Sequence, residues 1–129
     1  MPVVDTAQSD PVGTNISTVT ISAPASGVAP TVETVKASSG TWFMIDIDNT
    51  SNSSDTYVKA WDVAGGAAVT LGSTSPEGVF LVRGGGRTSY SCSGGTAFSA
   101  GMKICAVTAG GTAGTTGMTG DVVVRILYS

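Results

Sequence analysis

The chain contains no histidine, so acid–base or nucleophilic chemistry would have to rely on its carboxylates. Asp46 and Asp48 alternate with Ile45 and Ile47, and on a β-strand they would share one face, about 6.6 Å apart. That separation is close to the spacing of paired carboxylates in glycosidases. Acidic residues at the end of a solvent-facing strand also keep a protein soluble, and we favour this interpretation. We therefore expect no catalytic residue and no enzymatic activity.

The segment that begins at Asp46 can be compared with a calcium-binding loop. Such a loop needs glycine at its sixth position and glutamate at its twelfth, but Ser51 and Tyr57 occupy these positions. Asp48 and Asp55 could still supply oxygen ligands to a looser site. In the absence of histidine, two cysteines are too few for a structural zinc site. We expect neither a metal nor another cofactor.

Three aromatic residues offer another route to ligand binding. Trp42, Tyr57 and Trp61 could form a platform on which a sugar ring stacks, as aromatic residues do in carbohydrate-binding modules. Tyr57 and Trp61 are four residues apart, which places them on the same face of a strand. Because an aromatic pair in a β-sandwich more often belongs to the core, the platform is the alternative interpretation.

The glycine-rich stretch 83–87, with the sequence RGGGR, is not a phosphate-binding loop, because no lysine follows it and no helix is predicted there. It predicts a hairpin turn between strands at 79–83 and 87–93. Arg83 and Arg87 would flank the tip of this turn. In that position they could contact an acidic partner.

The composition predicts that β-strands position these side chains. Valine occurs sixteen times and leucine three times, while glycine, threonine and serine together supply 52 of the 129 residues. Glycine and β-branched residues disfavour helix, and no segment keeps a helical apolar period for three turns. Nine segments instead have strand-like composition or alternation: 16–21, 31–35, 42–48, 57–63, 68–71, 79–82, 88–93, 102–108 and 121–128.

Two of these segments alternate clearly. In one, Phe43, Ile45 and Ile47 are expected on an apolar face, with Met44, Asp46 and Asp48 on the opposite polar face. In the other, Val122, Val124, Ile126 and Tyr128 alternate with Val123, Arg125 and Leu127. Turn-forming residues separate the segments and no crossover helix is available, so the strands are expected to be antiparallel. We predict an antiparallel β-sandwich, jelly-roll-like or Ig-like, with about eight or nine strands.

The two cysteines lie in neighbouring predicted strands. If these strands pair as a hairpin centred between Phe98 and Ser99, Cys92 lies opposite Cys105, and a disulfide could join them. The alternative is two free thiols in a chain made in a reducing cytoplasm. We favour the thiols, because the first twenty residues lack the features of a signal peptide.

The first part of the chain differs from the rest. Four of the five prolines precede residue 31, and we expect an extended arm at 1–15 followed by a single domain at 16–129. An arm can fray, or it can become ordered on a partner, with Pro2, Val3 and Val4 as candidate contacts.

The formal net charge of -3 argues against a nucleic-acid partner. No apolar run is long enough to span a membrane.

An ordered series of short motifs in 57–128 carries a family resemblance. The series comprises YVKAWD at 57–62, VTLGSTSP at 69–76, VFLV at 79–82, FSAGMKICAVT at 98–108 and GDVVVRILY at 120–128. It resembles small β-sandwich virion proteins of tailed bacteriophages. The resemblance covers roughly 41–129 and is carried by short motifs. Cys92 and Cys105 are not part of it.

This resemblance implies a structural role on the virion, as a capsid decoration (cement) protein made in the bacterial cytoplasm. Such proteins are commonly homotrimers that bind the major capsid protein and bridge capsomers on the outer surface of the head, often through terminal arms. A carbohydrate- or receptor-binding module of a phage tail or fibre is the alternative. The first role would use the arm and the arginines, and the second would use the aromatic platform.

Overall fold

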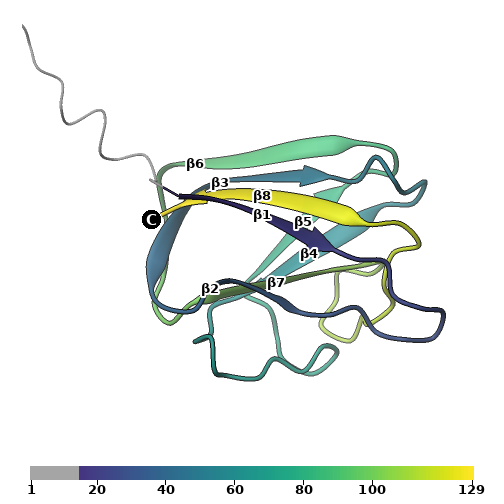
Figure 1. The fold of residues 1–129 in the computed structure, drawn as a ribbon, viewed down its shortest axis with the longest axis horizontal. Helices are drawn as coiled ribbons and strands as arrows, with labels where there is room; N and C mark the ends of the chain where they lie inside the picture. The colour runs from purple at the N-terminus through teal and green to yellow at the C-terminus, as the bar shows by residue number, and fades with distance from the viewer. Residues whose placement is uncertain (1–14) are drawn as a thin grey trace, which may run out of the picture.

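The structure, a computed structural model, describes residues 15–129, which form eight β-strands in two antiparallel sheets (Figure 1). None of these residues belongs to a helix, so the described part of the chain contains no helix that could cross a membrane. The predicted antiparallel β-sandwich is confirmed. The strands are β1 (Asn15–Ile21), β2 (Glu33–Lys36), β3 (Gly40–Asp48), β4 (Thr56–Trp61), β5 (Gly78–Val82), β6 (Arg87–Phe98), β7 (Met102–Val107) and β8 (Val122–Tyr128).

The strands pair as one long hairpin that is folded over on itself. β1 pairs with β8, β2 with β7, β3 with β6 and β4 with β5, all antiparallel. Further pairing of β3 with β8 and of β4 with β7 completes two sheets, ordered β1-β8-β3-β6 and β2-β7-β4-β5. This nested order is that of a jelly roll, one of the two sandwich topologies expected from the sequence.

The main hydrophobic core lies between the sheets and follows the predicted alternation in β8. Val122, Val124 and Ile126 are completely buried, while Arg125 between them is half-buried on the outer face. In β3 the alternation changes phase at a bulge between Trp42 and Met44. Trp42 therefore packs against the core with Ile45 and Ile47, in the role predicted for Phe43.

One predicted strand, 68–71, is wrong, because this segment is a loop. Its backbone forms a local turn in which the amides of Ser73 and Thr74 donate to the carbonyl of Thr70. Val69 and Leu71 pack against a second hydrophobic cluster that contains Trp61, Cys105 and Val107. The alternation in this segment thus reflects packing onto the face of a sheet, and not pairing with a strand.

The hairpin predicted at 83–87 is also wrong. β5 and β6 lie in different sheets, so the glycines form an arch from one sheet to the other. The arch needs glycine, because Gly85 has φ +73° and a Cβ at Gly84 would lie 2.1 Å from the carbonyl oxygen of Ser53. Asn49 holds the arch by donating its side-chain amide to the carbonyl of Arg83 at 3.1 Å.

The connection from β6 to β7 is a second arch, so Cys92 and Cys105 belong to different sheets. Both are free, as we predicted, and the hairpin geometry that would have paired them does not occur. Gly94 and Gly95, which fall between two of the predicted strands and so were expected to form a turn, instead lie within β6 opposite the bulge in β3. Both have positive φ.

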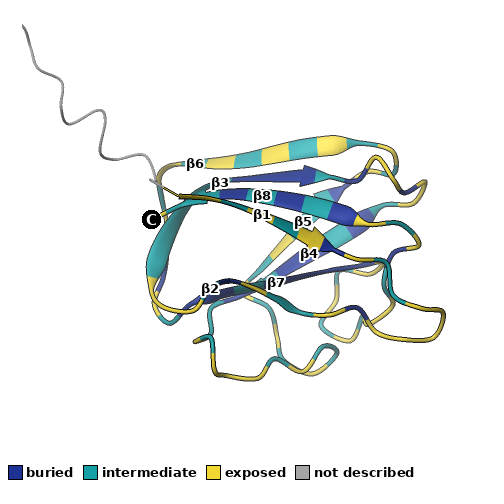
Figure 2. Ribbon diagram, in the orientation of Figure 1, coloured by how far each residue is buried: buried dark blue, intermediate teal, exposed yellow. Residues whose placement is uncertain are grey.

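The outer faces of the two sheets differ in how they are covered. Loops gather along the outer side of β2-β7-β4-β5, where they bury the second hydrophobic cluster (Figure 1). As a result, β4 and β7 are largely buried on both faces (Figure 2). In the other sheet, β6 alternates between exposed and half-buried residues over most of its length, because its outer side faces solvent.

Candidate docking face and its charged cluster

The outer face of β1-β8-β3-β6 is a regular array of side chains set by the strand register, and we call it the docking face. Three rows cross the sheet, each with one residue from each strand. The first row is mainly apolar and the next two carry the charges. In the order β1, β8, β3, β6, the rows are Ile16, Leu127, Met44 and Ser91; Thr18, Arg125, Asp46 and Ser89; and Thr20, Val123, Asp48 and Arg87.

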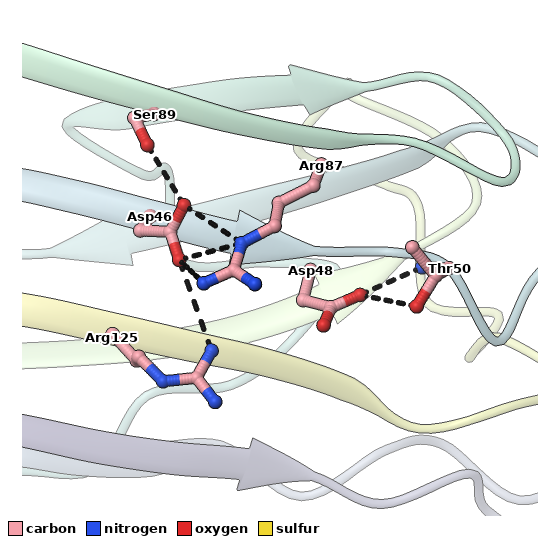
Figure 3. Close-up of polar contacts among 6 residues, drawn as sticks. All are labelled: Asp46, Asp48, Thr50, Arg87, Ser89 and Arg125. Atoms are coloured by element: carbon pink, nitrogen blue, oxygen red, sulfur yellow. Dashed lines mark hydrogen bonds and ion pairs between the residues drawn. The ribbon is translucent and has the colours of Figure 1, made fainter.

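Asp46 is the centre of the charged cluster (Figure 3). Its carboxylate, in a residue only 7% exposed, accepts hydrogen bonds from Arg87 Nη2 at 2.6 Å and Nε at 3.1 Å, and from Ser89 Oγ at 2.8 Å. Arg125 Nη1 lies 3.8 Å from the same carboxylate. The hydrogen bond from Arg87, aided by that from Ser89 and by both positive charges, lowers the pKa of Asp46 despite its burial.

Asp48 uses a different set of partners on the same face. It accepts hydrogen bonds from the hydroxyl of Thr50 at 2.5 Å and from its backbone amide at 3.0 Å, and these bonds lower the pKa of Asp48 (Figure 3). Asp46 and Asp48 do lie on one face, as predicted. Because both pKa values are lowered, neither carboxylate is set up to hold the proton that a glycosidase acid must donate.

Arg125 lines a hollow of about 350 Å³ between the apolar row and the row that contains Asp46 and Arg125. Its Nη1 atom is buried but has no hydrogen-bond acceptor within the described chain. The Asp46 carboxylate 3.8 Å away balances its charge but is too distant for a hydrogen bond, so an oxygen atom supplied by a partner could bond to Nη1. The walls of the hollow are Ile16, Met44, Asp46, Arg87, Ser89, Arg125, Ile126 and Leu127.

The structure separates the two arginines expected to act together. Arg87 belongs to the charged cluster, whereas Arg83 lies on the arch and pairs with Asp55 at 3.2 Å. Asp55 also accepts the backbone amide of Gly84, so its role is to hold the arch. It does not share partners with Asp48, and the described residues contain no cluster of three or more cysteine or acidic side chains that could hold a metal.

The three aromatic residues of the alternative interpretation are divided between two clusters. Tyr57 and Trp61 lie on the same face of β4, as predicted, but they pack beneath the loops and Trp61 is only 2% exposed. Trp42 packs on the other side, between the sheets, with its ring 5.8 Å from that of Phe80. The three rings therefore do not share one exposed platform.

The candidate arm contacts Pro2, Val3 and Val4 lie outside the described residues. Sequence reasoning missed Arg125 as a site residue, although the alternation put this side chain on the opposite face of the strand from Val124 and Ile126. The missing information was the register that sets Arg125 opposite Asp46. Sequence reasoning also missed the buried Lys59, whose ammonium donates to the carbonyls of Gly111 at 2.6 Å and Gly114 at 2.8 Å.

Comparisons with protein-family models, with curated proteins and with solved structures find no match to this chain. The proposals below therefore rest on the geometry of the chain and on the motif resemblance.

Proposed function

We propose that this chain is a capsid decoration (cement) protein of a tailed bacteriophage. It binds the major capsid protein on the outer surface of the head and bridges neighbouring capsomers as a homotrimer. Its role is structural, and it needs no cofactor. The docking face is the surface that meets the capsid.

The observation that carries this proposal is the contrast between the two outer faces of the sandwich. Loops of the chain itself cover β2-β7-β4-β5, whereas the docking face presents an apolar row next to Arg125, which pairs with Asp46 at 3.8 Å but whose Nη1 atom makes no hydrogen bond within the described residues. Ile16 in this row is 73% exposed. Apolar area beside a polar group that awaits a partner is characteristic of a surface that binds another protein.

The architecture is compatible with such a role. Jelly rolls occur in viral capsid proteins and in lectins, so the fold alone does not choose between the two candidate functions. Strands rich in valine and threonine lose little side-chain entropy when they bind, because their side chains are short and stiff. On a capsid, many identical copies and an oligomeric chain would add avidity to a modest contact area.

The proposal is tested by assembling capsids of the parent phage with and without this chain. We expect the chain to appear on the head surface in electron micrographs and to raise the temperature at which the capsids rupture. Native mass spectrometry should give three copies per free oligomer. An unchanged capsid surface together with unchanged heat resistance would contradict the capsid role, and density on the tail would favour the receptor-binding alternative.

A matched pair of variants tests the docking face itself. Ile16→Asp places a charge in the apolar row, whereas Val28→Asp makes the same change at an exposed residue of the β1–β2 loop. We expect Ile16→Asp to weaken capsid binding about tenfold or more and Val28→Asp to leave it unchanged. Equal binding by the two variants would contradict the choice of face but not the capsid role.

A further inference from the structure

The sandwich is open along the side where the edge strands β5 and β6 meet. The arch joins the end of β5 to the start of β6, but the other ends of these strands enclose a cavity of about 290 Å³. Gly78 and Phe80 line it from β5, and Thr96, Ala97 and Phe98 line it from β6. The cavity thus lies between the two sheets, away from the docking face.

Aromatic rings form part of the walls of this cavity. Trp42 and Phe80 meet edge to face, with ring centroids 5.8 Å apart and an interplanar angle of 85°. Phe98 and Met102 are buried residues of the main core that also line the cavity, and Trp61 borders it from β4 while its ring packs on the outer side of the sheet. Such walls suit an apolar group or a cation that can lie against aromatic rings.

Only acidic residues supply charge to the lining. Asp62 and Glu77 line the cavity, and no lysine or arginine does so. The Asp62 carboxylate accepts backbone amides of Ser99 at 2.7 Å and Ala100 at 2.8 Å, and these bonds lower its pKa. Glu77 Oε2 accepts the backbone amide of Asp62 at 2.8 Å. Backbone amides therefore hold both carboxylates in place, and Glu77 is tied to the backbone of Asp62.

We propose that this cavity binds a small organic cation with an apolar body, such as an alkylammonium or quaternary ammonium group. The aromatic rings attract the cation through their negative faces, the apolar lining removes the hydrocarbon part from water, and the carboxylates balance the charge. This binding is independent of the proposed capsid role. The group can belong to a free amine or to a lysine side chain of a partner protein, since both carry the same chemistry.

The two tryptophans provide a direct measurement, because the only tryptophans of the chain both line the cavity. Benzyltrimethylammonium is the probe, and its neutral analogue with carbon in place of nitrogen is the matched control ligand. We expect saturable quenching of tryptophan fluorescence by the cation, with at least about tenfold weaker binding of the neutral analogue. Butylammonium, which mimics a lysine side chain, distinguishes the two sources: tighter binding than benzyltrimethylammonium points to a protein partner, and weaker binding to a free quaternary amine.

Two variants with equal loss of charge separate a local effect from a general one. Glu77→Gln removes a charge at the cavity but keeps an oxygen that can accept the amide of Asp62, and Glu33→Gln removes a charge on β2. We expect about threefold weaker binding of the cation by Glu77→Gln and no change for Glu33→Gln. Trp42→Leu should weaken binding about tenfold through loss of a ring.

The proposal would be overturned by either of two results. One is equal affinity for the cation and its neutral analogue, which would make the cavity a purely apolar packing gap. The other is an absence of saturable quenching at ligand concentrations that leave the circular dichroism spectrum unchanged. Because Glu77→Gln is made at an exposed residue, the charge test does not depend on the stability of Trp42→Leu.

Discussion

Lys59 lies directly opposite Cys105 in the β4–β7 ladder, and both residues have no exposed surface. Their side chains lie on the outer face of the sheet, where Lys59 contacts the loop that joins β7 to β8 and the Cys105 thiol lies 3.5 Å from the carbonyl of Thr31. No carboxylate of residues 15–129 forms a salt bridge with Lys59, and its ammonium donates instead to backbone carbonyls of the loop that joins β7 to β8. A lysine placed in this way works as a strut that ties a glycine-rich loop to the sheet.

Because Lys59 ties the loop to the sheet, we expect the protein to lose stability when the ammonium group of Lys59 is removed. In Lys59→Met the carbonyls of Gly111 and Gly114 lose their donor, and we expect the free energy of unfolding to fall by about 1–3 kcal/mol. Lys103→Met is the control, because Lys103 donates to the carbonyl of Ala67 from a half-buried position. Its loss should cost less than about 1 kcal/mol. Urea denaturation measures both changes, and equal stability of Lys59→Met and the wild type would refute the strut.

The buried thiol of Cys105 leads us to expect a loss of stability at alkaline pH. Burial raises the pKa of its thiol from 9.0 to about 11, so the folded chain holds this proton when the unfolded chain has released it. Stability contributed by this thiol is therefore complete below pH 9 and declines as the pH rises to 11, by up to about 2 kcal/mol. Lys59 acts in the opposite direction, because desolvation lowers its pKa from 10.5.

This pH dependence can be isolated with a pair of variants. In a Cys92→Ala background, Cys105 is the only thiol, and adding Cys105→Ala removes it. The difference in unfolding free energy between the two proteins should shrink between pH 9 and pH 11. A difference that stays constant across this range would show that the Cys105 thiol is not protected by the fold.

The paired carboxylate of Asp46 leads us to expect a loss of stability in acid. Its lowered pKa means that the unfolded chain, with a value of 3.8, takes up the proton first as the pH falls. The stabilisation is present above pH 4 and is lost as the pH decreases through the lowered value. Asp46→Asn should cost about 1–2 kcal/mol at pH 7, a modest amount because Arg87 is half exposed.

Asp48→Asn is the matched control for this prediction, because Asp48 lies on the same face but, within residues 15–129, accepts hydrogen bonds only from Thr50. We expect it to cost less than Asp46→Asn at pH 7. Thermal unfolding between pH 2.5 and pH 7 should also show a shallower acid dependence for Asp46→Asn than for the wild type. If Asp48→Asn lowered the free energy of unfolding more than Asp46→Asn, Asp46 would not be the centre of the charged cluster.

We expect the first arch to depend on the hydrogen bonds of Asn49. This completely buried residue donates its side-chain amide to the carbonyls of Ser54 at 3.0 Å and Arg83 at 3.1 Å, and accepts the amide of Asn52 at 2.9 Å. Asn49→Ala should lower the free energy of unfolding by about 2–4 kcal/mol, since it leaves buried polar groups unpaired. Asn49→Asp keeps the acceptor but loses the donor, and should also destabilise the chain. Denaturation in urea tests both, and a loss below 1 kcal/mol for Asn49→Ala would argue against this role.

Local backbone geometry explains which features the sequence could predict. The alternation of Val122, Val124 and Ile126 with Arg125 and Leu127 identified β8 and both of its faces. This works because successive side chains of any strand point to opposite sides, whatever strand lies beside it. The same property placed Asp46 and Asp48 on one face and Tyr57 and Trp61 on another. It failed at Phe43, where a bulge that depends on the neighbouring strand shifts the phase.

The sequence by itself therefore determined that this chain is an all-β sandwich and which side most strand residues face. Only the tertiary structure decided which strands pair, and with that the composition of each site. Arg87 bonds to Asp46 across a sequence separation of 41 residues, and Lys59 meets the loop carbonyls across more than 50. Alternation has a period of two residues and says nothing about partners so distant along the chain. Whether a glycine-rich stretch forms a hairpin or an arch depends on how two whole sheets pack together.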